Sequence, residues 1–143
     1  MYFVDTAKLN SHLDYFDKNI TLTEKIKPNS EVDQLALERI VQVMIESVLD
    51  IGNMMIDGFI MRDPGSYLDI VHILIDEKVI PKEEQEAYES LISIRKDLVQ
   101  NYDNVHHDVL QHVIKENNDI FSTFTTHVRT YLANEMGVAN TFK

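Results

Sequence analysis

Residues 31–57 read EVDQLALERIVQVMIESVLDIGNMMID, and this stretch decides the fold class. Its apolar side chains recur at helical spacing and cover most of the circumference of an α-helix. They are Leu35, Ile40, Val41, Met44, Ile45, Val48, Leu49, Ile51, Met55 and Ile56. A helix that is apolar on nearly every side is covered by its neighbours, so we expect this one to run through the centre of a bundle.

One helix is predicted before this stretch and one soon after it. In the first, Asp5 is placed to cap the N-terminus, and the helix should end before Pro28. Its apolar residues recur at steps of four and three: Leu9, Leu13, Phe16 and Ile20. The turn signal Asp63-Pro64-Gly65 follows the central helix. Ser66 then caps a short third helix that ends near Lys78.

Two longer helices are predicted in the remainder of the chain. Pro81 suits the first turn of the fourth, which runs to about Tyr102. The fifth keeps helical spacing to about Met136, with Gly137 as its C-terminal stop. Its apolar residues are Val109, Val113, Phe121, Phe124, Val128 and Tyr131. The sequence therefore predicts an all-α, five-helix, up-and-down bundle that forms a single domain over residues 1–143.

The composition excludes several classes of protein. The chain has no cysteine, so it has neither disulfides nor a thiolate metal site nor a cysteine nucleophile. It lacks a basic N-terminal region and any run of the roughly 20 apolar residues that a membrane span needs, so we expect a cytoplasmic protein with no membrane partner. Asp and Glu outnumber Lys and Arg by 24 to 13, a net charge of −11, which repels polyanions at long range. Any contact with RNA must therefore be local.

A single cation interrupts an apolar stripe on the predicted fourth helix. The stripe follows steps of three and four along the helix: Tyr88, Leu91, Arg95, Leu98 and Tyr102. An unpaired buried charge is unfavourable, so Arg95 must find an acceptor. We expect it to pair with a carboxylate, or to face a cleft or a partner.

The central helix carries a polar stripe that supplies candidate acceptors. Its members are Arg39, Gln42, Glu46, Asp50, Asn53 and Asp57. Two interpretations stay open. The stripe is either the solvated face of the helix, or part of it, especially Glu46, Asp50 and Asn53, lines an internal cleft or a dimer interface beside Arg95.

The fourth helix also carries a motif that resembles a known family. Residues 95–102 read RKDLVQNY, which resembles the Arg-x4-His-x-Tyr motif of HepT-like proteins in the HEPN superfamily, with Gln100 at the position of the histidine. The segments 46–58, 59–67 and 1–5 also resemble that family, so the resemblance covers nearly the whole chain. A group from Gram-positive bacteria shares the glutamine-bearing motif.

The resemblance implies a homodimer whose paired motifs form a metal-independent endoribonuclease site without a cofactor, usually as the toxin of a toxin-antitoxin pair. Such cleavage needs a group that takes a proton from the 2′-hydroxyl, another that protonates the leaving oxygen, and a cation for the developing charge. Arg95 fits the last role. Gln100 cannot carry a proton near neutral pH, so the activity should be weakened or lost. His106 and His107 are the nearest substitutes.

Tyr102 and the remaining histidines have more than one interpretation. The resemblance implies that a nucleotidyltransferase antitoxin modifies the motif tyrosine, Tyr102, with adenylate groups; the alternative is a tyrosine that packs the end of the fourth helix. Asp108 and His112 share a helical face next to His107, but no further ligand completes a metal site. Three histidines are expected to be isolated at the surface or core edge: His12, His72 and His127.

Two functions follow from these residues. The first is a HepT-like ribonuclease toxin whose cleft contains Arg95, Gln100 and Tyr102, weakened by the missing histidine. The second is a non-catalytic dimeric module that uses the same cleft to hold a nucleotide, an RNA or a partner protein. The acidic surface and Gln100 favour the second.

Overall fold

The structure is a computed structural model that describes residues 4–27 and 29–141, with side chains described as far as residue 136. All regular secondary structure in these ranges is helical, which confirms the predicted all-α class. The elements are α1 (Thr6–Lys25), α2 (Glu31–Gly58), α3 (Tyr67–Asp76), the 3₁₀ turn η1 (Lys82–Glu84), α4 (Gln85–Ser93), α5 (Arg95–Gln100), α6 (His107–Phe121) and α7 (Phe124–Thr141).

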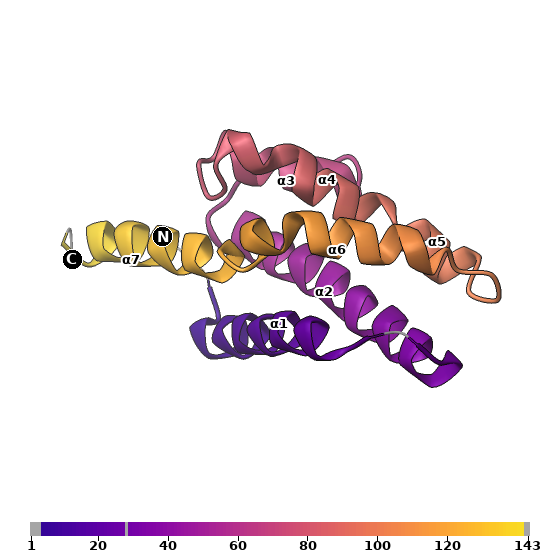
Figure 1. Ribbon diagram of the computed structural model, residues 1–143. Coiled ribbons are helices and arrows are strands. Elements are labelled where there is room, and N and C mark those ends of the chain that lie inside the picture. Colours follow the sequence, from indigo (N-terminus) through magenta and orange to yellow (C-terminus); the bar gives the residue numbers. More distant parts are fainter. Residues whose placement is uncertain (1–3, 28, 142–143) are drawn as a thin grey trace.

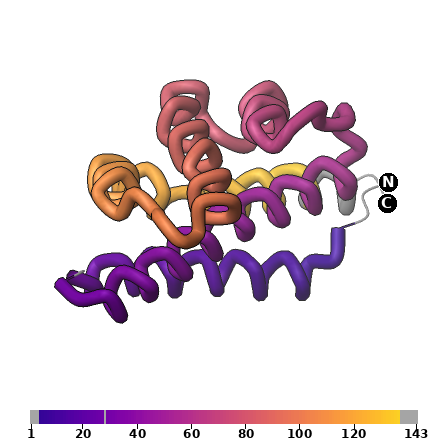
Figure 2. Tube along the Cα trace, turned by 90° about the vertical axis from the view of Figure 1, so that its right-hand side faces the viewer, coloured from indigo at the N-terminus to yellow at the C-terminus, as the bar shows by residue number. Residues whose placement is uncertain are grey.

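The long helix α2 is central, as predicted. Figure 1 shows α1 on one side of α2 and the pair α3 and α4 on the other, while α6 crosses between them. Figure 2 shows the same layers from the side. One contiguous core contains buried apolar side chains from all seven α-helices. Leu35 is an exception to the prediction, because it lies in the first turns of α2 and is 63% exposed.

Four buried aromatic rings hold the helices together. Phe16 of α1 lies 5.1 Å from Phe124 of α7, centroid to centroid, and Tyr88 of α4 lies 5.6 Å from both Phe121 and Phe124. Tilted aromatic pairs of this kind stabilise a core by roughly 0.5–1.5 kcal/mol beyond the area that they bury. The rings thereby connect α1, α4, α6 and α7.

The predicted helix starts are confirmed by their caps. The Asp5 carboxylate accepts from the backbone N–H of Lys8 (3.0 Å), and the Ser66 hydroxyl accepts from that of Asp69 (3.1 Å). Helix α1 ends at Lys25, ahead of Pro28. Pro28 itself and residues 1–3, which contributed to the family resemblance, lie outside the described residues.

Two of the five predicted helices are interrupted. The fourth begins as η1, breaks at Ile94 and ends at Gln100 rather than Tyr102, while the fifth breaks after Phe121. Serine and threonine hydroxyls next to both breaks bond to carbonyls of the preceding turn, which bends helices. The bonds are Ser90 to Ala87, Ser93 to Glu89, Ser122 to Asn118 and Thr123 to Ile120. The predicted stop at Gly137 is wrong, because α7 continues to Thr141.

No helix in the described part of the chain has the length and apolar character needed to cross a membrane.

Candidate functional site

Arg95, the first residue of α5, pairs with a carboxylate of the central helix. Its Nε donates to Oε1 of Glu46 at 2.7 Å, and the arginine side chain is 26% exposed. The hydrogen bond to Glu46 raises the pKa of Arg95 above its ordinary value. One of the predicted outcomes for this arginine, an ion pair with a carboxylate, is thus present. The guanidinium stays charged and points toward the polar stripe of α2.

Tyr67 covers the same guanidinium from the side of α3. The Cζ atom of Arg95 lies 4.6 Å from the centre of the Tyr67 ring, a cation–π contact. Glu46 and Tyr67 together fix the plane of the guanidinium. Among the described side chains, none accepts a hydrogen bond from its two Nη atoms. These two donors are therefore available to an anionic ligand.

The other two residues predicted to line a cleft, Asp50 and Asn53, are exposed on the same face of α2 as Glu46. Asn53 lines an open hollow of about 400 Å³ next to Tyr67. The remaining lining residues come from the loop before α3 and from its first turn: Pro64, Gly65, Ser66 and Ile70. The structure therefore brings Glu46 to Arg95 and Asn53 to the neighbouring hollow. It leaves Asp50 on the surface.

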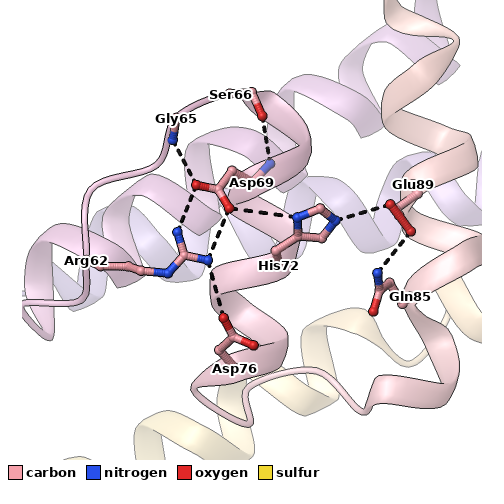
Figure 3. Close-up of polar contacts among 8 residues, drawn as sticks. All are labelled: Arg62, Gly65, Ser66, Asp69, His72, Asp76, Gln85 and Glu89. Atoms are coloured by element: carbon pink, nitrogen blue, oxygen red, sulfur yellow. Dashed lines mark hydrogen bonds and ion pairs between the residues drawn. The ribbon is translucent and has the colours of Figure 1, made fainter.

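A polar network fixes the loop that positions Tyr67 (Figure 3). Arg62 donates from both Nη atoms to the carboxylate of Asp69, at 2.8 and 3.1 Å, and the Gly65 N–H donates to the same carboxylate at 2.8 Å. These bonds hold the pKa of Asp69 below its ordinary value, with Arg62 as the main cause. Exposed ion pairs add little stability one by one. Here they define the path of the chain from residue 62 to the start of α3.

The network continues through a histidine into α4. His72 Nε2 lies 3.2 Å from Oε2 of Glu89, and its Nδ1 lies 3.8 Å from Asp69. Gln85 donates to the other oxygen of Glu89 at 3.1 Å. The expectation that His72 is isolated is therefore wrong. It connects α3 with α4, and so joins the loop before Tyr67 to the element that precedes Arg95.

Gln100 and Tyr102 do not meet Arg95 within one chain. Gln100 is the exposed last residue of α5, about 8 Å along the helix axis from Arg95 at 1.5 Å per residue. Tyr102 lies in the turn beyond and is 74% exposed. This exposure contradicts the alternative in which Tyr102 packs the end of the helix. Its hydroxyl is open to solvent.

Asp97 holds the turn that carries Tyr102. Its carboxylate accepts from the backbone N–H of His106 at 3.0 Å and from the side chain of Asn101 at 3.1 Å, and it lies 3.2 Å from Nδ1 of His106. These bonds, chiefly the one to the His106 backbone, lower the pKa of Asp97. Helical periodicity does not predict this loop closure. The one signal in the sequence is a carboxylate near the end of a helix, followed by a polar run.

Two further histidines, His107 and His127, are also paired. His107 Nε2 lies 2.7 Å from Oε2 of Glu38, so this residue joins the start of α6 to α2. His127 lies 3.2 Å from Glu84 and 3.3 Å from the Thr123 hydroxyl, so it is not isolated as expected. No group of three or more His, Cys, Asp or Glu side chains in the described part is arranged to hold a metal ion.

The Asp97 closure predicts an acid-sensitive turn. A carboxyl whose folded pKa is lowered contributes stability above its unfolded pKa of about 3.9 and loses it as the pH falls through the folded value. We expect the protection of the His106 amide from hydrogen exchange, taken relative to the intrinsic rate at each pH, to fall below about pH 4. In Asp97→Asn this protection should be lower at pH 7 and depend less on pH. Asp103→Asn, an exposed position in the same turn, is the control. Equal exchange in Asp97→Asn and the parent would show that the closure does not hold the turn.

Comparisons with known proteins agree with this arrangement of helices. A family model described as Ribonuclease HepT-like matches residues 9–128. A Bacillus subtilis (strain 168) protein named "Putative RNase YutE" is 44% identical over 144 residues, covering 100% of both chains. A solved structure of B. subtilis YutE, described as a cytosolic protein of unknown function, has a TM-score of 0.92 and covers 96% of each chain at 44% identity.

A more distant solved structure shares the fold. It is described as a toxin-antitoxin with AMP-PNP, has a TM-score of 0.73 at 15% identity, and is aligned over 84% of this chain and 96% of its own. At that identity the likeness concerns the helical architecture alone.

Proposed function

Because this chain belongs to the HepT-like ribonuclease family, we propose that it binds RNA in a cleft built around Arg95 and cleaves that RNA slowly or not at all. The observation that carries the proposal is the guanidinium between Glu46 and Tyr67, with two donors unused. It is a local cation on a chain with a net charge of −11, as an RNA contact here requires. The name of the relative YutE supports the same substrate class.

The proposed chemistry assigns separate roles to the motif residues. Arg95 binds the phosphate through its Nη atoms and stabilises the charge that develops when the 2′-hydroxyl attacks. Gln100 forms hydrogen bonds to the phosphate or a base but carries no proton, so the acid-base step lacks its usual group. His106 stays a candidate substitute, since Asp97 contacts its Nδ1 and leaves Nε2 free for proton transfer.

We infer a homodimer, because Gln100 and Tyr102 do not reach Arg95 of their own chain. A partner's residues complete the cleft, with Glu46, Asp50 and Asn53 along its wall. Exposed apolar side chains adjoin the polar stripe: Val32 and Leu35 continue it toward the start of α2, at 74% and 63% exposure, and Val99 of α5 is 41% exposed. Burial of these side chains favours pairing of two copies. The proposed molecule is cytoplasmic and consists of one domain.

The exposed tyrosine suggests a partner. Toxin-antitoxin assembly is described for the more distant structural neighbour, and a nucleotidyltransferase antitoxin would find the hydroxyl of Tyr102 accessible. Adenylation there would place phosphate charge next to the cleft and repel RNA.

A second candidate function is a non-catalytic dimeric module that holds a nucleotide, an RNA or a partner protein in the same cleft. Gln100 and the strongly negative charge favour it. It lacks bond cleavage, and its ligand need not be RNA, so RNA binding and RNA cleavage are measured together.

RNA binding and cleavage in the presence of a chelator test the proposal. We expect Arg95→Ala to reduce affinity for single-stranded RNA by about ten- to a hundredfold, because a charge-assisted hydrogen bond contributes about 1.5–3 kcal/mol. Arg129→Ala is the matched control, since Arg129 pairs with Asp14 and Asp17 on α1. Sedimentation of each variant measures the dimer in parallel.

Each outcome decides between the functions. Cleavage that requires Arg95 supports a residual ribonuclease. Intact RNA that is bound through Arg95 by a dimer supports the module. Equal RNA affinity of the parent, Arg95→Ala and Arg129→Ala would show that Arg95 does not bind RNA, which contradicts RNA as the ligand in both proposed functions.

A further inference from the structure

The hollow beside Tyr67 has the chemistry of a small aromatic-binding site. Its walls include the Tyr67 ring, which is half exposed, the proline ring of Pro64 and the side chain of Ile70. Among the lining residues, Asn53 is the one with a side-chain amide. Gly65 leaves space in the hollow because it has no side chain. An aromatic wall with one amide at its edge suits a flat, polar-edged ring, because such a ring stacks on the aromatic face and pairs with the amide through its rim.

The position of the hollow relative to Arg95 restricts the class of ligand that it can bind. Tyr67 contacts the Arg95 guanidinium and also lines the hollow. A phosphate bound to Arg95 and a ring bound in the hollow would therefore both lie next to Tyr67. A phosphate with an adjoining flat ring describes a nucleotide unit. We propose that this hollow is a nucleobase subsite that receives the base next to the phosphate bound by Arg95. This inference rests on the proposed RNA binding and adds the part of the site that binds the base.

Roles for the lining residues follow from their chemistry. Tyr67 stacks on the base through the ring face that Arg95 does not cover, and every base permits such a contact. The Asn53 amide, with one acceptor and two donor hydrogens, bonds to the base edge and sets any preference among bases. The loop that forms the remaining wall is preformed, because Asp69 holds Arg62 and Gly65 and its N–H bonds to Ser66 (Figure 3). Little ordering is then needed when the base enters.

Two short probes measure the subsite directly. One is an eight-nucleotide oligoadenylate, and the other is a ribose-phosphate strand of the same length without bases, both in chelator. We expect the parent protein to bind the oligoadenylate at least about fivefold more tightly, as stacking on one aromatic ring provides. In Tyr67→Leu that preference should fall to near unity, while Tyr67→Phe keeps it.

The comparison of the two strands distinguishes two roles of Tyr67, which are stacking on a base and orienting the Arg95 guanidinium. If Tyr67 acted only by orienting the guanidinium, Tyr67→Leu would weaken both strands by the same factor and the subsite would be overturned. A filled hollow gives an independent check. We expect Gly65→Leu to lose the preference for the strand with bases and to keep its affinity for the strand without them.

Asp63→Leu is the matched control, because Asp63 is an exposed residue of the same loop that does not line the hollow. Thermal melts confirm that each variant is folded. Failure of the proposed function appears separately, as Arg95→Ala leaving both strands unaffected. A base preference that survives in Tyr67→Leu and Gly65→Leu, or is absent from the parent, overturns the subsite whatever Arg95 does.

Discussion

Replacement of Gln100 by histidine is expected to raise the rate of RNA cleavage by roughly a hundred- to ten-thousand-fold, the range that a positioned acid-base group contributes. An imidazole titrates near neutral pH, whereas the glutamine amide does not. The change is local, because Gln100 is the exposed end of α5 and a new ring there meets no packed neighbour. Cleavage of a labelled RNA in chelator, with product quantified over time, provides the measurement.

Two further variants show whether this gain uses the proposed cleft. Gln100→Asn keeps an amide and should cleave no faster than the parent. Arg95→Ala in the Gln100→His background should remove most of the gain, since the new proton carrier then lacks the cation that stabilises the phosphate. Unchanged cleavage in Gln100→His would contradict a composite site that lacks only its proton carrier. A gain that is independent of Arg95 would place the histidine at a different RNA contact.

The central helix explains why the fold was predictable. Its apolar circumference, together with the caps at Asp5 and Ser66, depends only on residues close in sequence, and local periodicity carries that information. The breaks at Ile94 and after Phe121 were missed. Side-chain hydroxyls that bond to the preceding turn decide them, and such bonds compete with helix geometry without changing the apolar pattern.

The candidate site was predictable only in part, for a related reason. The rule that an arginine in an apolar stripe needs an acceptor indicated the polar stripe of α2. It named Glu46 together with Asp50 and Asn53, and only Glu46 pairs with Arg95. The spacing of the sequence did not predict the role of Tyr67. Its position over Arg95 depends on the loop fixed by Asp69 and on how closely α3 approaches α2, and the local sequence pattern predicts neither of them.

That close approach is made possible by a glycine inside the central helix. Gly52 is buried in α2, and a Cβ built there would lie 2.5 Å from Cγ2 of Ile70 in α3. Helix interiors disfavour glycine by about 1 kcal/mol relative to alanine. The contact with Ile70 is a physical reason for its presence, because it lets α3 lie against α2 with Tyr67 at the start of α3 over Arg95.

Gly52→Leu is therefore expected to lower the free energy of unfolding by about 2–3 kcal/mol, although leucine is the better helix former, because extra atoms in a packed core displace their neighbours. Chemical denaturation measures the loss. Since the displaced element is α3, the variant should also weaken the Tyr67 contact with Arg95. Its preference for RNA with bases over the base-free strand should then decline even where the protein is fully folded.

The partner side chain supplies the decisive control. Removal of Cγ2 by Ile70→Ala should destabilise the parent by roughly 2–5 kcal/mol, the usual result of truncating a buried isoleucine. In the Gly52→Leu background the same truncation makes room for the new side chain, so its effect should be at least about 1 kcal/mol smaller. Additive effects would mean that α3 does not press on Gly52, and the close packing of α2 and α3 would no longer account for the position of Tyr67.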